Sequence, residues 1–156
     1  THFPDGYICP YCQTEHDTSY ANALSCSSRQ VAAFVQWIQQ QDFYEDTTII
    51  IAGDHLTMAA EFVEKMPEDA ERSTYHVIVN APIPPVRTEN RVFTTLDMFP
   101  TTMAALGVEI EGERLALGTN LFSERETLAE EYGLDVMNQE LAKKSEFYNK
   151  KLMYGS

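Results

Sequence analysis

The chain has 156 residues, of which 44% are hydrophobic and 22% are charged, and its formal net charge is −13. This composition is typical of one globular domain with a core of ordinary size. Nucleic acids and anionic membrane surfaces are bound through basic residues, so the acidic balance argues against both as partners. An anionic substrate would be repelled unless a cation sits in its binding site. No apolar run approaches the roughly 20 residues that a membrane helix needs.

The first part of the chain is expected to form a loop followed by a helix. Residues 5–25 are rich in turn-forming residues and lack an apolar period, which predicts a long loop. Ser27 with Gln30 three residues later fits a capping box. We therefore expect a helix from Ser27 to about Gln41. Its apolar stripe consists of Val31, Phe34, Val35 and Ile38.

Two short apolar runs predict strands. Residues 47–52 and 75–80 are almost continuously apolar and rich in β-branched side chains. Such runs are typical of strands that are buried on both faces of a parallel sheet. The segment between them, residues 56–71, mixes apolar and acidic residues and is expected to hold a short helix.

A second helix is predicted over residues 101–106, and Gly107 is expected to stop it. Pro100 is expected in its first turn, where proline is tolerated. Asp97 lies near the predicted helix start, so we expect it to cap the helix or to interact with the positive end of its dipole.

The C-terminal part is expected to contain short strands or turns and then more helix. Residues 108–122 include two glycines that favour turns, and residues 124–153 are predicted to be helical with a break at Gly133. The alternation of helices with apolar strands along the whole chain predicts an α/β architecture, with a mostly parallel sheet flanked by helices.

The three cysteines are Cys9, Cys12 and Cys26, so at least one is unpaired within this chain. A disulfide from Cys26 to Cys12, or to Cys9, is the favoured interpretation for an oxidising compartment. The Cys-x-x-Cys spacing also fits a zinc site with His16 as a weak fourth ligand, or a redox dithiol, and we consider both less favoured because no second Cys-x-x-Cys follows. Three reduced, buried cysteines are the remaining alternative.

Gly53, Asp54 and His55 come directly after the first predicted strand. In open α/β sheets, ligands bind beyond the carboxyl ends of the strands. A carboxylate and a neutral imidazole are ligands that suit zinc or manganese, and adjacent positions on a bending chain can reach one ion. We therefore predict that Asp54 and His55 bind a metal, the alternative being an ordinary surface turn.

Four segments resemble, in order, the sulfatase-like phosphoglycerol transferases and lipoteichoic-acid synthases of the alkaline phosphatase superfamily. Residues 1–6 resemble the segment whose histidine contacts the substrate phosphate, and residues 46–55 resemble the metal-ligand segment. Residues 94–101 resemble the family's T-x-D-x-x-P-T helix start, and residues 117–122 resemble its G-x-N-L-F segment. The resemblance covers most of residues 1–123 and implies the C-terminal portion of an alkaline phosphatase/sulfatase-like sandwich.

The resemblance implies roles for individual residues. Asp54 and His55 would ligate a catalytic divalent cation, Mn²⁺ in the nearest relatives, with Zn²⁺, Mg²⁺ and Ca²⁺ as alternatives. His2 would hydrogen-bond the substrate phosphate. Cys12 and Cys26 would form a disulfide, as cysteines near these positions do in the family, and Cys9 would be the odd thiol.

The same resemblance places the nucleophilic threonine and another metal ligand upstream of these residues. No threonine of this chain matches the nucleophile's motif, so we expect the chain alone to be catalytically incomplete without the N-terminal half of the same domain. Residues 1–123 would be the C-terminal part of the catalytic domain, and residues 124–156 a helical C-terminal extension. The expected location is the extracellular or periplasmic face of a bacterial membrane, with anchoring helices upstream.

The function implied by the resemblance is transfer of phosphoglycerol from a glycerol-phosphate donor lipid to an envelope polysaccharide, through a phospho-threonine intermediate. The first alternative keeps the fold and changes the reaction to that of a sulfatase or phosphodiesterase. The second is a non-catalytic glycan-binding module, which has no need for the ligand pair Asp54 and His55.

Overall fold

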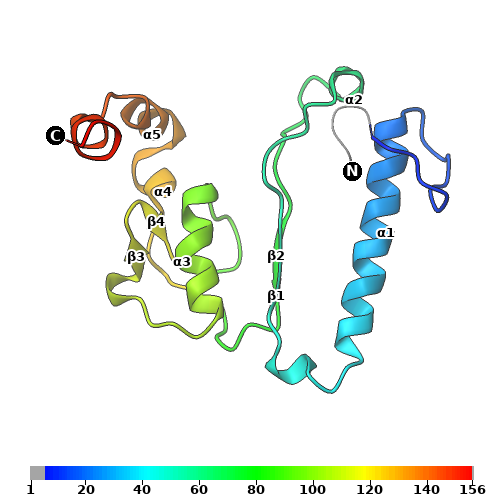
Figure 1. The fold of residues 1–156 in the computed structure, drawn as a ribbon, viewed down its shortest axis with the longest axis horizontal. Coiled ribbons are helices and arrows are strands. Elements are labelled where there is room, and N and C mark those ends of the chain that lie inside the picture. Colours follow the sequence, from blue (N-terminus) through cyan, green and yellow to red (C-terminus); the bar gives the residue numbers. More distant parts are fainter. Residues whose placement is uncertain (1–5, 156) are drawn as a thin grey trace. The chain divides into compact units, whose positions relative to one another are not determined.

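A computed structural model describes residues 6–155, and it divides the chain into two compact units, Thr1–Ala81 and Pro82–Ser156. Both units combine helices with short strands (Figure 1), which agrees with the α/β class expected from the sequence. The predicted division between a catalytic part and a helical extension, at residue 123, falls inside the second unit and stays a prediction.

The first unit begins with a loop that leads into the long helix α1, Ser19–Gln39. The helix starts eight residues before Ser27, so the prediction of a loop as far as residue 25 was wrong. Thr18 is the actual N-cap, and its side chain accepts a hydrogen bond from the backbone N–H of Ala21 at 3.1 Å. The first two turns of α1 are held in place because Asn22, Ala23 and Cys26 are buried.

Strands β1, Ile49–Ala52, and β2, His76–Val79, form a two-stranded sheet in this unit. The two strands run antiparallel, with Ile49 opposite Val79 and Ala52 opposite His76, so the expectation of parallel pairing is not met by these strands. A parallel pair needs a crossover that returns the chain to the same end. The connection instead holds only the five-residue helix α2, Ala60–Glu64.

The residues of both strands are half-buried, except Ala52, which is exposed, whereas the apolar runs predicted burial on both faces. The antiparallel ladder continues past β1, because the backbone N–H of Gly53 donates to the carbonyl of Tyr75 at 2.8 Å. This pairing fixes the direction in which the chain leaves β1 toward Asp54.

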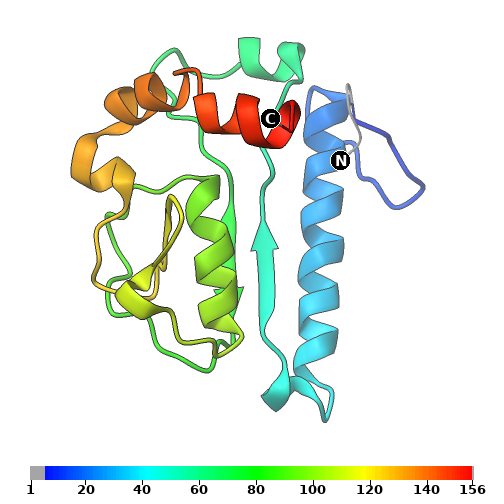
Figure 2. The same ribbon diagram turned by 60° about the vertical axis from the view of Figure 1, so that its left-hand side comes forward.

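The second unit is organised around α3, Thr95–Ala105, which packs against a small antiparallel hairpin (Figure 2). The hairpin consists of β3, Arg114–Leu115, and β4, Gly118–Thr119, and the short helical turn η2, Glu111–Glu113, precedes it. Gly107 ends the helix with a φ of +83°, as the sequence predicted. Pro100 lies inside α3 rather than in its first turn, because the helix begins at Thr95.

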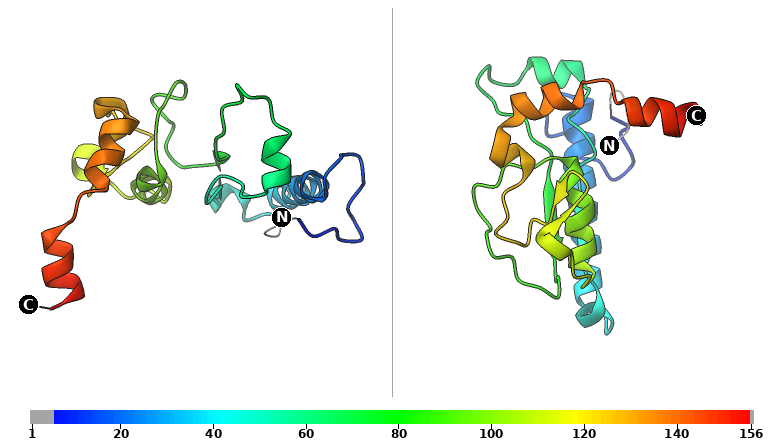
Figure 3. Two further views of the ribbon diagram at one scale, coloured as in Figure 1. Left: turned by 90° about the horizontal axis from the view of Figure 1, so that it is seen from above. Right: turned by 90° about the vertical axis from the view of Figure 1, so that its left-hand side faces the viewer.

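Three short helical segments follow the hairpin. Gly133, with a φ of +84°, separates α4, Leu128–Tyr132, from α5, Leu134–Leu141, which confirms the predicted break. The last segment is η3, Tyr148–Met153, and Figure 3 shows it (red) beyond α5. In the part of the chain that the structure describes, no helix combines the length and the apolar character needed to cross a bilayer.

Candidate functional site

The predicted metal ligands lie together at the end of β1. The side chains of Asp54 and His55 are 86% and 61% exposed, and Asp54 Oδ2 lies 3.5 Å from His55 Nε2. Two donor atoms that are each about 2.1 Å from one ion, at a tetrahedral angle, lie about 3.4 Å apart. The two side chains therefore present an oxygen and a nitrogen that one divalent ion can bind at the same time.

Local hydrogen bonds orient the side chains of both candidate ligands. The backbone N–H of His55 donates to Asp54 Oδ1 at 2.9 Å, and this bond is the main reason why the pKa of the Asp54 carboxyl lies below its usual value. His55 Nδ1 lies 2.8 Å from the carbonyl oxygen of Leu56. Because a carbonyl only accepts, Nδ1 carries a proton, and Nε2 is the ring nitrogen that a metal could bind.

Gly53 allows close packing where the chain turns out of the sheet toward these ligands. A Cβ at this position would lie 3.0 Å from Thr74 Cβ and 3.3 Å from the backbone nitrogen of Tyr75. A side chain at this position would therefore need Thr74 and Tyr75 to shift by a few tenths of an ångström.

Asp54 and His55 make up half of the ligand set of an ordinary protein-bound metal. Among residues 6–155, no third histidine, cysteine or acidic side chain joins them in a cluster that could hold an ion. Tetrahedral zinc sites use at least three protein ligands. The predicted phosphate contact, His2, lies outside the described residues.

The three cysteine side chains converge, although none forms a disulfide. Cys9 Sγ lies 3.6 Å from Cys12 Sγ and 3.8 Å from Cys26 Sγ, whereas a disulfide bond is about 2.05 Å long. The pairing of Cys12 with Cys26 therefore stays a prediction. The backbone N–H of Tyr11 lowers the pKa of the Cys9 thiol, whereas burial raises the pKa of Cys12.

Two of the four family-like segments serve packing in the second unit. Asp97, 1% exposed, accepts hydrogen bonds from the backbone N–H groups of Thr94 and Thr119, both at 2.8 Å. The first of these bonds belongs to a capping box at the start of α3, which confirms the capping role expected for Asp97. Thr101 adds a second link, because its Oγ1 accepts from the backbone N–H of Leu121 at 3.0 Å.

A network that the sequence reasoning missed joins α4 to the loop before α3. The Arg91 and Glu130 side chains are each 7% exposed, and Arg91 Nε donates to Glu130 Oε1 at 3.0 Å. Although burial opposes it, the backbone N–H groups of Thr127 and Val92 and the Arg91 guanidinium hold the pKa of Glu130 below its usual value. The Thr-x-x-Glu capping signal was readable in the sequence, but the arginine 39 residues away was not.

The family assignment agrees with these segments. The sequence model of the sulfatase family matches residues 1–108, more than half of the chain. The chain therefore belongs to the sulfatase family, which is a family of enzymes. The matched region contains the ligand pair after β1 and the start of α3, so the resemblance drawn from the sequence motifs is confirmed at the level of the family.

Individual proteins similar to this chain carry the name phosphoglycerol transferase I. The protein from Escherichia coli O139:H28 strain E24377A is 28% identical over 116 residues, which cover 69% of this chain and 15% of that protein. The protein from Salmonella choleraesuis strain SC-B67 is 28% identical over 153 residues, or 92% of this chain and 19% of that protein. The chain thus spans less than a fifth of these relatives. No solved structure matches it significantly.

Proposed function

We propose that this chain is the C-terminal part of the catalytic domain of a divalent-metal-dependent phosphoglycerol transferase that modifies bacterial envelope glycans. The observation that carries the proposal is the pair Asp54 and His55, whose ligand atoms lie 3.5 Å apart at the end of a strand in a sulfatase-family chain. The name of the similar proteins supports phosphoglycerol transfer as the reaction.

In this proposal Asp54 and His55 hold a divalent cation, Mn²⁺ in preference to Zn²⁺, Mg²⁺ or Ca²⁺. When bound, the cation lowers the pKa of a nucleophile and neutralises charge that develops on the phosphate oxygens. The backbone N–H of His55 keeps the Asp54 carboxylate ionised, and the Leu56 carbonyl orients the His55 ring. His2 donates a hydrogen bond to the substrate phosphate.

The nucleophile in this proposal is a threonine in the upstream half of the domain. Its hydroxyl oxygen loses its proton and attacks the phosphorus of a glycerol-phosphate donor lipid, and the lipid alcohol of the donor leaves with a proton. A hydroxyl of the acceptor polysaccharide then loses its proton and attacks the same phosphorus, and the threonine oxygen leaves and takes up a proton. The net charge of −13 disfavours binding of a phosphodiester, and a bound cation would offset this repulsion locally. The corresponding location is the extracellular or periplasmic face of a bacterial membrane, anchored by helices upstream of these residues.

A hydrolase of the same fold is the second candidate, and the observation that favours it is the match to the sulfatase family. In that case water, rather than a glycan hydroxyl, would discharge the covalent intermediate. The two candidates share the ligand pair. They differ in the acceptor, and a sulfatase would also differ in its substrate, so one protein preparation can be tested against both classes of substrate.

The test uses the enzyme with its upstream half and compares Asp54→Ala/His55→Ala with the wild type. We expect the variant to lose at least about 100-fold in transfer of phosphoglycerol from phosphatidylglycerol to a glucan, because a bound metal contributes several kcal/mol of charge stabilisation. It should also lose the rise in melting temperature that Mn²⁺ gives the wild type. At 100 times its dissociation constant, a ligand adds about 2.7 kcal/mol to stability.

His16→Ala/Asp17→Ala is a matched control, because it removes another exposed, adjacent histidine–aspartate pair. It should keep both the activity and the response to Mn²⁺. Hydrolysis of a sulfate ester or phosphodiester without transfer would favour the hydrolase. Unchanged activity and metal response in Asp54→Ala/His55→Ala would contradict the proposal and favour a non-catalytic glycan-binding module.

A further inference from the structure

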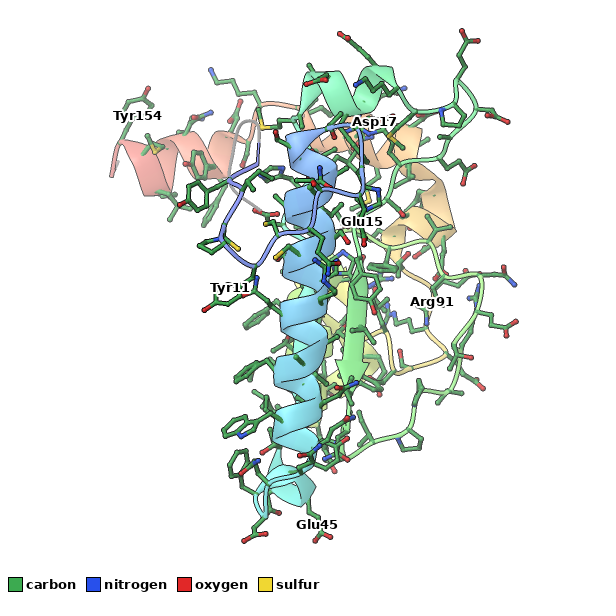
Figure 4. The ribbon with its side chains drawn as sticks, turned by 90° about the vertical axis from the view of Figure 1, so that its right-hand side faces the viewer. Tyr11, Glu15, Asp17, Glu45, Arg91 and Tyr154 are labelled. Atoms are coloured by element: carbon green, nitrogen blue, oxygen red, sulfur yellow. The ribbon has the colours of Figure 1, made fainter. Side chains whose placement is uncertain are left out.

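A second cluster of potential metal ligands lies in the first unit, in the loop that precedes α1 and on α1 itself. Cys9 and Cys12 belong to a tight turn, in which the backbone N–H of Cys12 donates to the carbonyl of Cys9 at 3.0 Å. Cys26 is on the second turn of α1 and is 3% exposed. Tyr11 lies between these two cysteines in the sequence, and Figure 4 shows it on the loop that runs beside α1.

The distances between the sulfur atoms match a shared metal ion better than a disulfide. In a tetrahedral zinc site with Zn–S bonds of about 2.3 Å, neighbouring sulfur atoms lie about 3.8 Å apart. The sulfur of Cys9 lies 3.6 Å from that of Cys12 and 3.8 Å from that of Cys26, and all three lie within 4.8 Å of one another. A disulfide would join two of these sulfurs at about 2.05 Å and leave the third thiol beside it without a role.

We propose that Cys9, Cys12 and Cys26 bind one zinc ion, at a site separate from the ligand pair Asp54 and His55. Three thiolates are soft ligands that select zinc over magnesium, calcium or manganese. The proposal does not depend on the proposed transferase activity, and it excludes the disulfide between Cys12 and Cys26.

The surroundings of the three sulfurs fit a bound thiolate. Gln30, one turn after Cys26 on α1, donates from Nε2 to Cys26 Sγ at 3.2 Å. The backbone N–H of Cys9 donates to Cys12 Sγ at 3.3 Å. Hydrogen bonds of this kind to metal-bound ligands orient them and stabilise their charge.

The proposed site needs a fourth ligand in addition to the three sulfurs. Among residues 6–155 no further histidine, cysteine or acidic side chain joins the three sulfurs. Cys26 also lines a shallow hollow of about 330 Å³, together with Tyr11, Arg29 and Gln30. In the proposed site a water molecule is therefore the fourth ligand.

A zinc ion at this position would attach the loop to α1. The loop is already attached to the helix by the side chain of Asn22. This side chain accepts a hydrogen bond from the backbone N–H of His16 at 2.9 Å and donates one to the His16 carbonyl at 2.8 Å. The zinc would add a second attachment nearer the start of the chain. In sequence, this attachment comes seven residues after His2.

The first experiment removes bound metal from the full-length protein with a chelator under reducing conditions and then titrates it with Co²⁺. Only thiolate ligands give cobalt an intense charge-transfer absorption in the near ultraviolet, so the band separates this site from Asp54 and His55. We expect one equivalent of cobalt to develop the band and zinc to displace it. We expect zinc affinity to fall by more than about 100-fold in each of the variants Cys9→Ser, Cys12→Ser and Cys26→Ser. Loss of a residue that only hydrogen-bonds to a metal ligand already costs about 10- to 100-fold, and these variants lose a ligand itself. The matched control, Asp54→Asn, should keep the band.

A second measurement on the wild type avoids any folding defect of the cysteine variants. Titration of the native protein with an organomercurial, with a zinc indicator present, should release one zinc as three thiols react. A disulfide found by peptide mapping of the protein as purified would overturn the proposal, whether it joined Cys26 to Cys12 or to Cys9. Three reactive thiols that release no zinc, in a protein that develops no cobalt band, would overturn it as well.

Discussion

Asp54 and Asp97 both lie in segments that resemble the same enzyme family, yet the two units use them in opposite ways. The Asp54 side chain is 86% exposed at the end of β1 and shares a metal-ligand geometry with His55. Asp97 is 1% exposed, and both of its carboxylate oxygens accept backbone hydrogen bonds in the second unit. One carboxylate is exposed to solvent, whereas the other accepts the hydrogen bonds that hold α3 against β4.

This difference shows that an aspartate in a family-like segment does not by itself have a chemical role, because it can also be a packing residue. A metal ligand must leave a lone pair accessible, so it tolerates exposure and gains little from packing. A buried carboxylate must have its acceptors satisfied, because an unpaired buried polar group is costly. Substitutions in the two units should therefore separate loss of stability from loss of metal binding.

The largest effect on stability is expected from Glu130→Ala in the second unit. The change leaves the buried Arg91 guanidinium without its carboxylate, and breaking a buried pair costs about 3–5 kcal/mol. We expect a loss of stability of about 3 kcal/mol, at the lower end of this range. The reason is that the Arg91 guanidinium still donates to the carbonyls of Ser123 and Arg125, at 2.9 and 2.8 Å. Denaturant unfolding of the wild type and the variant measures the difference. Unchanged unfolding would mean that the pair is not formed.

The same pair predicts the direction of acid sensitivity. Because the pKa of Glu130 in the folded protein lies below its ordinary value of 4.5, its stabilisation is fully present above pH 4.5 and is lost as the pH falls through the lower, folded pKa. The gap in stability between wild type and Glu130→Ala should therefore shrink below this pH. A gap that widened on acidification would contradict the assignment.

A smaller loss is expected from Asp97→Ala. The change removes the capping box of α3 and leaves the buried N–H of Thr119 without its partner, at a cost of about 2–3 kcal/mol. Asp97→Asn should fall in between, because it keeps one carbonyl oxygen as an acceptor. Asp135→Ala is the matched control, since it removes an exposed aspartate from the first turn of α5. Comparable losses for Asp97→Ala and Asp135→Ala would argue that burial of Asp97 is unimportant.

Gly118→Ala tests the contact between β4 and α3 by steric means. A Cβ at Gly118 would lie 2.0 Å from the carbonyl oxygen of Leu96, which Pro100 leaves without the usual helical N–H donor. We expect a loss of about 1–3 kcal/mol, as for other overpacked sites. Gly107→Ala provides a comparison, because its Cβ would enter open space. Only the backbone φ of +83° would be strained, and we expect this strain to lower stability by about 1 kcal/mol. A milder effect at Gly118 would contradict the close packing.

The smallest effect on stability is expected from Asp54→Asn in the first unit. The side chain is exposed, so the midpoint of denaturant unfolding without metal should not change. With Mn²⁺ present, the variant should lose the stabilisation that the wild type gains. A marked loss of stability in the absence of metal would show that Asp54 is a packing residue, as Asp97 is, and would remove the contrast between the two units.

Much of the local structure was predictable from the sequence because its signals act over a few residues. The apolar run at residues 47–52 predicted β1, and Gly53, Asp54 and His55 were expected at its carboxyl end. The glycines at 107 and 133 end helices as predicted, because glycine adopts a positive φ at little cost. These features place the candidate ligand pair without any knowledge of distant contacts.

What only the tertiary structure decided involves partners far apart in the chain. The burial of Cys26 and the cap at Thr18 extend α1 past its predicted start, and the ladder between β1 and β2 runs antiparallel. Three contacts show this. Cys26 lies beside Cys9, 17 positions away, and the N–H of Thr119 donates to Asp97, 22 positions away. Arg91 pairs with Glu130, 39 positions away. Local propensity carries no information about such pairs, because each forms only when packing brings its two segments together and removes their polar groups from water.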